Sequence, residues 1–263
     1  MTILETNRAT MCFGGVTAVD DLNIQVKRDE IVAIIGPNGA GKTTAFNMIT
    51  GVYTPNEGNI RFCPSGDGEN LVDITGMRPD LIARKGIART FQNIRLFPKM
   101  TVLENVLIAN HLHLRSGILS AMVGWPYYNK EARHIEEKSL RLLELVGLLE
   151  DADKMAPSLP YGKQRRLEIA RALATDPVLL LLDEPAAGMN PQETQELTAF
   201  VRQIRDHFNL TVLLIEHHMQ IVMDISDRIY VLDFGETIAS GTPQAIQDNE
   251  RVISAYLGVE EDA

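Results

Sequence analysis

A glycine-rich loop near residue 40 constrains the fold of this chain more than any other feature of its sequence. Residues 31–35 read Ile-Val-Ala-Ile-Ile, an apolar and largely β-branched run that predicts a buried strand. The run ends at segment 36–44, Gly-Pro-Asn-Gly-Ala-Gly-Lys-Thr-Thr, which matches the pattern G-x-x-x-x-G-K-[ST] in full, and a helical stretch follows from Lys42. A strand, a glycine loop and a helix in this order open a nucleotide-binding α/β unit.

The loop is suited to bind phosphate groups through its backbone. Its glycines let the chain turn so that successive N–H groups face an anion, and the helix that follows adds its positive N-terminal end. Lys42 is expected to reach the β- and γ-phosphates, and the Thr43 hydroxyl to bind Mg²⁺. The candidate nucleotide contacts are therefore Gly36, Pro37, Asn38, Gly39, Ala40, Gly41, Lys42, Thr43 and Thr44. Kinases, GTPases and motor ATPases share such a loop, so the loop alone predicts only a nucleoside triphosphate ligand.

Two adjacent carboxylates supply a second candidate half of the site. Residues 178–182 form an apolar run that predicts a buried strand, and Asp183 and Glu184 follow it directly. Ligands collect at the carboxyl ends of strands in open α/β sheets, so Asp183 can hold Mg²⁺ there, directly or through water. Glu184 is placed to polarise an attacking water as a general base. An acidic pair at a strand end is often only the start of a solvated loop, but the phosphate loop upstream favours the functional interpretation.

Composition excludes several classes of protein. The 263 residues, 45% of them hydrophobic, are enough for one α/β core with an inserted subdomain and no disulfides. Cys12 and Cys63 stand in no metal-ligand spacing, which fits a reducing compartment. A net charge of −10 argues against a nucleic-acid partner. The longest apolar runs, such as 178–182, are far shorter than the roughly 20 residues that span a bilayer. We therefore expect any membrane role to come through partners.

The character of the sequence changes along the chain. Residues 3–62 suggest short strands with turns at Gly14-Gly15 and at 55–58, and further runs typical of buried parallel strands are 178–182, 211–215 and 229–232. Between Gln92 and Ser158 the pattern is mostly helical. There, segment 130–150 places Ile135, Leu142, Val146 and Leu149 on one helical face, and Glu137 and Arg141 form an i,i+4 pair.

These changes predict the organisation of the chain. We expect one domain over residues 1–263, with a nucleotide-binding core and β subdomain at 1–92 and 159–241. The remaining parts would be a helical subdomain at 93–158 and a C-terminal helical tail at 242–263.

Taken together, the motifs resemble the ATPase subunits of ABC transporters over essentially the whole chain. The resemblance implies an α/β fold, in which a P-loop NTPase core carries an N-terminal antiparallel β subdomain and an inserted α-helical subdomain. It also implies that Gln92, in Arg89-Thr-Phe-Gln92, contacts the metal ion and water and senses the membrane subunit. His217 would contact the γ-phosphate, and Phe13 would stack on adenine, where tyrosine is commoner in the family. A loop histidine satisfied by backbone and a packed phenylalanine are the plain structural alternatives.

The segment 159–173 resembles the family's signature, usually Leu-Ser-Gly-Gly-Gln followed by a helix. In the family this helix N-terminus points at the γ-phosphate held by the opposite subunit. Here Pro160 replaces the serine, Tyr161 the first glycine and Lys163 the glutamine, and only Gly162 is kept. We expect these four residues to contact the partner's nucleotide as a weakened clamp, which the long side chain of Lys163 could partly compensate.

A further departure from the family pattern lies after the acidic pair. Asn190 stands where most family members carry an aspartate that communicates across the dimer. The strength of signalling between the subunits is therefore in question, whereas the fold should tolerate the change.

Several further sequence segments resemble one branch of the family, the branched-chain amino-acid importers. They are 86–92, 96–109, 186–191 and 215–228, and the insert 111–128 resembles the larger of the two ATPase subunits of that system. Because 118–128 is apolar and aromatic, we expect Trp125 either at a surface that faces membrane subunits or in the core of the helical subdomain.

Several alternatives stay open. The ATPases of urea importers and of lipopolysaccharide exporters are similar to this chain. A soluble ABC protein of DNA repair or translation is a remote alternative, since such proteins typically carry two cassettes or a long coiled coil. A P-loop kinase would explain neither the region of Gln92 nor the signature helix.

The resemblance implies cofactors and partners as well. The cofactors are ATP and Mg²⁺, and the partners are a second ATPase subunit, either the same chain or a paralogue, two membrane-spanning permease subunits and indirectly a substrate-binding protein. The chain would then lie peripherally at the cytoplasmic face of the inner (plasma) membrane. The transported substrate and the choice between homodimer and heterodimer stay open, because selectivity belongs to the binding protein and the membrane subunits.

Overall fold

The chain consists of two compact units. A computed structural model describes residues 1–110 and 126–257, and contacts divide the chain into a first unit, 1–92 with 178–263, and a second unit, 93–177. The expected boundary lay at residue 158. Segment 159–177 instead belongs with the helical residues, because helix α6 (Tyr161–Leu173) packs against helix α3 (Val102–Asn110).

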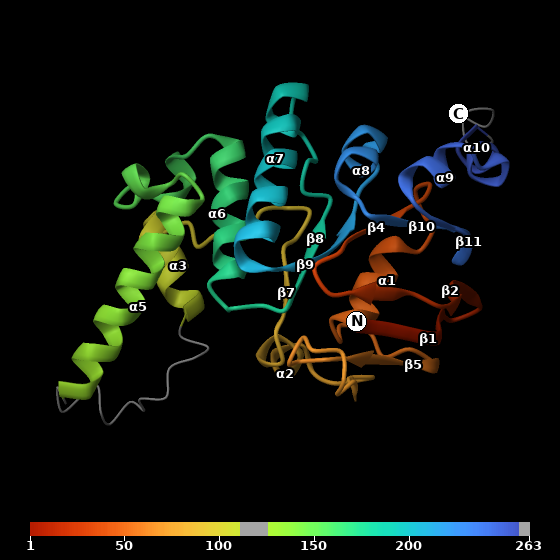
Figure 1. Cartoon of the computed structure of the whole chain (residues 1–263), viewed down its shortest axis with the longest axis horizontal. Coiled ribbons are helices and arrows are strands. Elements are labelled where there is room, and N and C mark those ends of the chain that lie inside the picture. Colours follow the sequence, from red (N-terminus) through yellow and green to blue (C-terminus); the bar gives the residue numbers. More distant parts are fainter. Residues whose placement is uncertain (111–125, 258–263) are drawn as a thin grey trace. The chain divides into compact units, whose positions relative to one another are not determined.

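A six-stranded sheet forms the centre of the first unit (Figure 1). Its order is β11-β10-β4-β9-β8-β7, and all neighbours are parallel except β10 and β11. The strands are β4 (Ile31–Ile35), β7 (Ile87–Arg89), β8 (Leu179–Asp183), β9 (Thr211–Ile215), β10 (Arg228–Asp233) and β11 (Glu236–Gly241). The predicted strands at 31–35, 178–182, 211–215 and 229–232 are thus confirmed. Because the parallel strands end at one edge, the loops after β4, β7, β8 and β9 gather there.

An antiparallel sheet forms the rest of the β structure in the first unit. Its order is β2-β1-β5-β6, with β3 paired to β1, and the strands are β1 (Thr2–Phe13), β2 (Val16–Leu22), β3 (Gln25–Lys27), β5 (Glu57–Phe62) and β6 (Val72–Asp73). One hydrophobic core joins this sheet, helix α1 (Lys42–Ile49) and the central sheet through Leu4, Phe46, Phe62 and Leu181, each fully buried. The phosphate loop therefore leaves a strand and enters a helix that are both anchored in the core.

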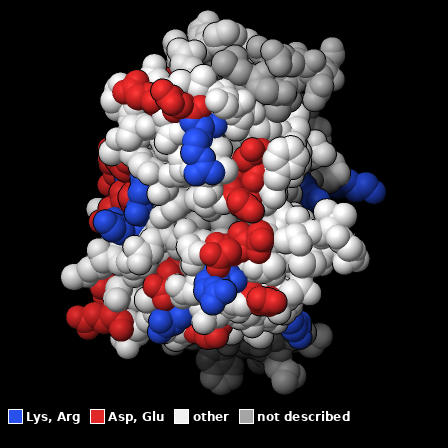
Figure 2. All heavy atoms as spheres, turned by 90° about the vertical axis from the view of Figure 1, so that its right-hand side faces the viewer, with Lys and Arg blue, Asp and Glu red and all other residues white. Residues whose placement is uncertain are grey.

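The remaining helices of the first unit cover the central sheet and its edge. They are α2 (Pro79–Arg84), α7 (Pro191–Phe208), α8 (Met219–Ile225), α9 (Pro243–Gln247) and α10 (Glu250–Leu257). The described part of the expected C-terminal tail, 242–257, is mostly helical, and both α9 and α10 contact β11. Figure 2 shows acidic and basic side chains interspersed over the described residues that are visible on one face of the molecule.

The second unit is helical. Its described residues, 93–110 and 126–177, contain α3, α5 (Pro126–Leu145), α6 and two short 3₁₀ turns, Leu149–Asp151 and Ala156–Ser158, and α3 packs against both α5 and α6. Leu142 and Val146 are buried as predicted, and Glu137 and Arg141 form the expected i,i+4 pair. The expectation for Leu149 is wrong: its side chain is 41% exposed, because the helix ends before Gly147, which has a φ of +72°.

Two expectations from the sequence concern membranes. Trp125 and the rest of segment 111–125 lie outside the described residues. Among residues 1–110 and 126–257, no helix combines the length and the apolar character that a membrane span requires.

Candidate functional site

The phosphate loop can form only with glycine at two of its positions. Gly36 and Gly41 have φ values of +152° and +96°, in the region that residues with a side chain rarely adopt. A Cβ on Gly36 would come 2.0 Å from the Leu232 carbonyl oxygen, and one on Gly41 would come 2.4 Å from the Ala18 carbonyl oxygen. Gly41 is also the N-cap of α1, so the first turn of that helix starts directly from the loop. The predicted strand, loop and helix are confirmed.

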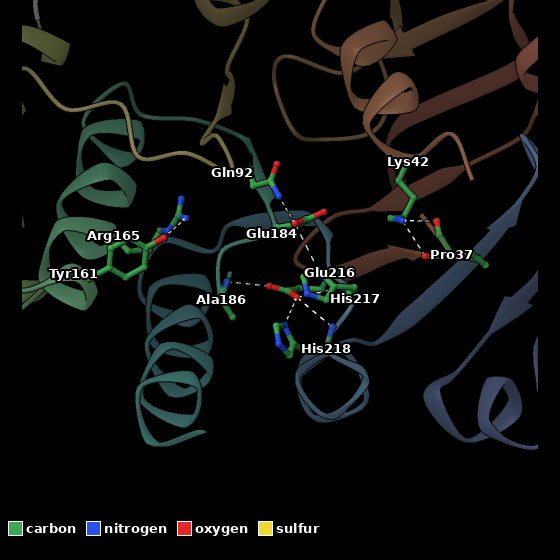
Figure 3. A network of polar contacts seen from close by, with 11 residues as sticks. Pro37, Lys42, Gln92, Tyr161, Arg165, Glu184, Ala186, Glu216, His217 and His218 are labelled. Atoms are coloured by element: carbon green, nitrogen blue, oxygen red, sulfur yellow. Dashed lines mark hydrogen bonds and ion pairs between the residues drawn. The ribbon is translucent and has the colours of Figure 1, made fainter. Parts of the chain in front are cut away.

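Lys42 folds back over this loop. Its ammonium donates hydrogen bonds to the carbonyl oxygens of Gly36 and Pro37, both at 2.8 Å (Figure 3). Burial lowers the pKa of Lys42 below its ordinary value, and the negative charge of Glu184 opposes this shift in part. The ammonium is thus held at the loop by neutral carbonyls, which an anionic ligand can replace with stronger charge-assisted hydrogen bonds.

Glu184 lies at the end of β8 in a strained backbone conformation. Its φ is +44°, which is uncommon for a residue other than glycine and is typical of functional sites. Its Oε2 accepts a hydrogen bond of 2.7 Å from Gln92 Nε2 and lies 3.7 Å from Nδ1 of His217 (Figure 3). The structure therefore brings together three residues that the sequence assigned to catalysis, from the loops after β7, β8 and β9.

One pocket of about 420 Å³ joins these groups to the phosphate loop. It is lined by Gly36, Pro37, Asn38, Gln92, Glu184, His217 and Tyr256. Every lining residue belongs to the first unit. Tyr256, in α10, is a residue that the sequence analysis missed, because nothing in its local pattern indicated that the C-terminal helix returns to the loop after β4.

Asp183 forms a buried ion pair that the sequence did not predict. Its Oδ2 lies 2.7 Å from Nη2 of Arg89, and both side chains are at most 9% exposed. The other terminal nitrogen of Arg89, Nη1, donates to Asn47 Oδ1 at 2.7 Å and Thr50 Oγ1 at 3.1 Å, both in or next to α1. Arg89 thereby fixes the end of β8 to the helix that follows the phosphate loop.

The three residues assigned to Mg²⁺ offer a suitable set of ligands. Thr43 is exposed in the first turn of α1, Gln92 lines the pocket, and the ion pair of Asp183 with Arg89 uses its Oδ2 atom. Hydroxyl, amide and carboxylate oxygens are the ligands that Mg²⁺ prefers. The residues present therefore fit the metal ion.

Glu216 is a second residue that the sequence analysis missed. Its carboxylate is fully buried, and its Oε1 accepts a hydrogen bond of 2.9 Å from the Ala186 backbone N–H. Its Oε2 accepts from the backbone N–H groups of His217 and His218, at 3.1 and 3.3 Å. One carboxylate thus joins the loop that follows Glu184 to the loop that carries His217 (Figure 3).

Phe13 is positioned at the end of β1 with its ring half exposed. Its exposed fraction is 43%, and its ring packs edge-on against Tyr53, with centroids 5.1 Å apart and planes at 74°. A ring that is supported on one side and open on another can stack on a nucleobase.

The signature residues belong to the second unit. Pro160 caps α6 without a side-chain hydrogen bond, and Tyr161 is 41% exposed in the first turn of that helix. The ammonium of Lys163 lies 2.6 Å from Asp151 Oδ2, and Lys154 binds the other oxygen of the same carboxylate, also at 2.6 Å. The charge of Lys163 is therefore already paired within its own unit.

Asn190 has a local structural role. It caps α7 in a reciprocal capping box: its side chain accepts from the Glu193 N–H, and the Glu193 carboxylate accepts from the Asn190 N–H, each at 3.0 Å. Asparagine and aspartate cap helices about equally well, so this departure from the family pattern costs α7 nothing.

The fold and the site together define an ABC-type ATP-binding cassette. The model of the family described as ABC transporter matches residues 19–187, and that of the branched-chain amino acid ATP-binding cassette transporters matches residues 236–262. The chain therefore belongs to the ABC transporter family, in the branch of branched-chain amino acid ATP-binding cassettes, whose members are ATPases coupled to transport.

Individual relatives are similar to this chain over nearly its whole length. The chain is 50% identical to the high-affinity branched-chain amino acid transport ATP-binding protein BraF of Pseudomonas aeruginosa and 48% identical to LivG of Escherichia coli K12, each covering 97% of this chain and 98% of the relative. The ADP conformation of MJ1267, an ATP-binding cassette of an ABC transporter, superposes with a TM-score of 0.83 at 34% identity, covering 98% of this chain and 99% of that one.

Proposed function

We propose that the chain hydrolyses ATP in the pocket of the first unit and so drives the import of branched-chain amino acids. The observation that carries the proposal is the convergence of Gln92, Glu184 and His217 on one pocket that residues of the phosphate loop also line. The transported substrate is inferred from the names of BraF and LivG, to which this chain is about half identical.

The residues of the pocket have separate tasks in this proposal. The loop N–H groups and Lys42 neutralise the phosphate charge, and Phe13 supports the nucleobase. Glu184, held by Gln92, accepts the proton of the attacking water. His217 donates to the γ-phosphate. Thr43, Gln92 and Asp183 would hold Mg²⁺, which supplies positive charge against the phosphate oxygens when bound.

The complete transporter requires more than this chain. In the proposed assembly a second ATPase subunit closes each site with its own signature segment, and two membrane-spanning permeases and a substrate-binding protein complete the importer. The assembly places the chain peripherally at the cytoplasmic face of the inner membrane. Exposure of Pro160, Tyr161 and Lys163 at the start of α6 supports a contact with a partner's nucleotide.

Glu184→Gln tests the proposed chemistry. The variant should bind ATP as the wild type does, while turnover falls by roughly 10²–10⁴-fold, because the amide cannot accept the proton. Nucleotide titration and phosphate release measure the two effects. Wild-type turnover in the variant would refute the role of Glu184.

A transport assay distinguishes the proposed substrates, branched-chain amino acids, from the alternative substrate urea. In an Escherichia coli strain that lacks LivG, the chain should restore uptake of labelled leucine, isoleucine and valine, and Glu184→Gln should not. Restored uptake of labelled urea without leucine uptake would contradict the substrate while leaving the ATPase function intact.

A further inference from the structure

The C-terminal helix α10 brings a polar side chain into the phosphate pocket that the proposed mechanism does not use. Tyr256 lies in the last turn of α10 and lines the same pocket as Gly36, Glu184 and His217. Helix α10 reaches this position because it packs against β11 and α9 at the edge of the central sheet. The C-terminal segment is therefore part of the pocket wall.

The hydroxyl proton of Tyr256 has no acceptor among the described residues. The hydroxyl oxygen atom is buried without a partner in full hydrogen-bonding geometry, and the backbone N–H of Gly36 lies close enough to lower its pKa in part. A neighbouring N–H faces the oxygen and leaves the hydroxyl proton without an acceptor. Buried hydroxyl groups are nearly always paired with protein, water or ligand, so an orphan in a pocket points to a partner that enters from outside. Burial raises the pKa of Tyr256 to about 12. The phenol therefore stays protonated at neutral pH and can donate a hydrogen bond.

Another buried tyrosine in the same unit shows the ordinary arrangement. Tyr230, on β10, is 6% exposed, and its hydroxyl bonds to Gln25 on β3: it accepts from the Gln25 N–H at 3.0 Å and lies 3.3 Å from the Gln25 carbonyl oxygen. The contrast indicates that the hydroxyl of Tyr256 is not needed to hold the fold together.

We propose that the Tyr256 hydroxyl donates a hydrogen bond to the terminal phosphate of a bound nucleoside triphosphate, so that α10 distinguishes a triphosphate from a diphosphate. Among the phosphates the terminal one is favoured, because Glu184 and His217, the residues proposed to act on it, line the same pocket. The inference rests on the proposed function, since it requires ATP to bind there. It adds a residue of the C-terminal helix to those that contact the reacting phosphate.

Tyr256→Phe, with Tyr230→Phe as the matched control, tests the inference. The probes are ADP and the β,γ-imido analogue of ATP, each with Mg²⁺, titrated against the full chain. Tyr256→Phe should weaken binding of the analogue roughly tenfold, as expected for a hydrogen bond to a charged group, and leave ADP affinity unchanged. Tyr230→Phe should change neither affinity.

The melting temperatures of the nucleotide-free variants supply an independent readout. Tyr256→Phe should melt at the wild-type temperature or above it, because the change removes a buried hydroxyl whose proton has no acceptor. Tyr230→Phe should melt lower, because it loses the bond to Gln25. A drop for Tyr256→Phe as large as that for Tyr230→Phe would show that the hydroxyl is structural and would overturn the inference.

Hydrogen exchange of residues 250–257 reports on the helix directly. The ATP analogue should slow amide exchange in α10 more than ADP does, and this difference should vanish in Tyr256→Phe. An unchanged ratio of analogue to ADP affinity in Tyr256→Phe, with wild-type binding intact, would overturn the inference alone. Failure of the wild type to bind either nucleotide would overturn the proposed function as well.

Discussion

The N-termini of helices α1 and α6 are both predicted from the sequence to face phosphate groups, but the two sites are built differently. At α1 the loop 36–41 contains three glycines, and Lys42 donates to the loop carbonyls of Gly36 and Pro37. At α6 the N-cap is Pro160, and Tyr161 contacts Arg165 through its ring and its hydroxyl. Lys163 is bound to Asp151. Both helices begin without a side-chain cap, so both leave backbone groups at the N-terminus.

The difference shows how a site keeps its groups available for a ligand. Backbone N–H groups held by glycine geometry have no means of turning to another partner. Long side chains can turn to another partner, and those of Tyr161 and Lys163 bind to residues of the second unit. We therefore expect the signature of this chain to act mainly through the N-terminal end of α6 rather than through these side chains.

The largest test of this comparison pairs Lys42→Ala with Lys163→Ala. Lys42→Ala should weaken ATP binding by roughly 100-fold or more, since it removes the ammonium that is proposed to make charge-assisted hydrogen bonds to the phosphates. Lys163→Ala removes a charge that is already paired and should change ATP turnover by less than about threefold. Nucleotide titration and phosphate release measure both. A loss of turnover in Lys163→Ala as large as that in Lys42→Ala would show that Lys163 leaves Asp151 in the working dimer.

A smaller effect is expected at the proline of the signature segment. Pro160→Ser adds the hydroxyl that other family members carry and should raise ATP-driven dimerisation or turnover by about tenfold at the partner's site. Pro160→Ala is the control, because it removes the ring without adding a hydroxyl. Turnover is measured with the partner's own glutamate intact and Glu184 replaced by Gln. Equal turnover in the serine and alanine variants would mean that the N-terminus of α6 binds the partner's phosphate without help from a hydroxyl group.

Changes in pH should alter the charge of Lys42 and that of Asp151 in different pH ranges, with the smallest effect near neutrality. Because the pKa of Lys42 is lowered, its ammonium is lost at a lower pH than that of an ordinary lysine, and ATP affinity should fall as pH rises into that range. In the same window the unfolded chain binds more protons, so the free energy of unfolding of the empty protein should rise with pH. Titrations of ATP between pH 7 and 10, with Lys42→Ala as the control, measure the first effect; a flat affinity in the wild type would contradict it.

The carboxylate of Asp151 at α6 should respond to acid. Hydrogen bonds from Lys154 and Lys163 hold the pKa of Asp151 below its ordinary value. The stability that this carboxylate contributes is therefore present above the unfolded pKa and is lost only as pH falls through the lowered folded value. An alkaline titration that stays below the raised pKa of Lys154 thus separates the phosphate loop from the signature segment without any substitution.

Much of the fold and site could be predicted because their signals are local. The strand before Gly36, the strand before Asp183 and the loop between strand and helix each follow from a few consecutive residues. Parallel strands then bring their following loops to one edge, which accounts for the meeting of Glu184 and His217.

The contacts that could not be predicted join segments far apart in the chain. The pairing of Arg89 with Asp183, the links from Glu216 to Ala186 and the return of Tyr256 to the phosphate loop depend on how the sheet closes. No periodicity or spacing encodes such contacts. The sequence likewise treated Lys163 as an available cation, because nothing local indicated that Asp151 would pair with it.

The buried carboxylate of Glu216 has a mechanical consequence. It is bonded to Ala186 on one side and to the backbone of His217 and His218 on the other. If either loop moved alone, a buried charge would lose part of its hydrogen bonding, which typically costs several kcal/mol. The lowest-energy motion therefore displaces both loops together, and a shift at His217 is passed as a rigid-body displacement to the segment that leads into α7.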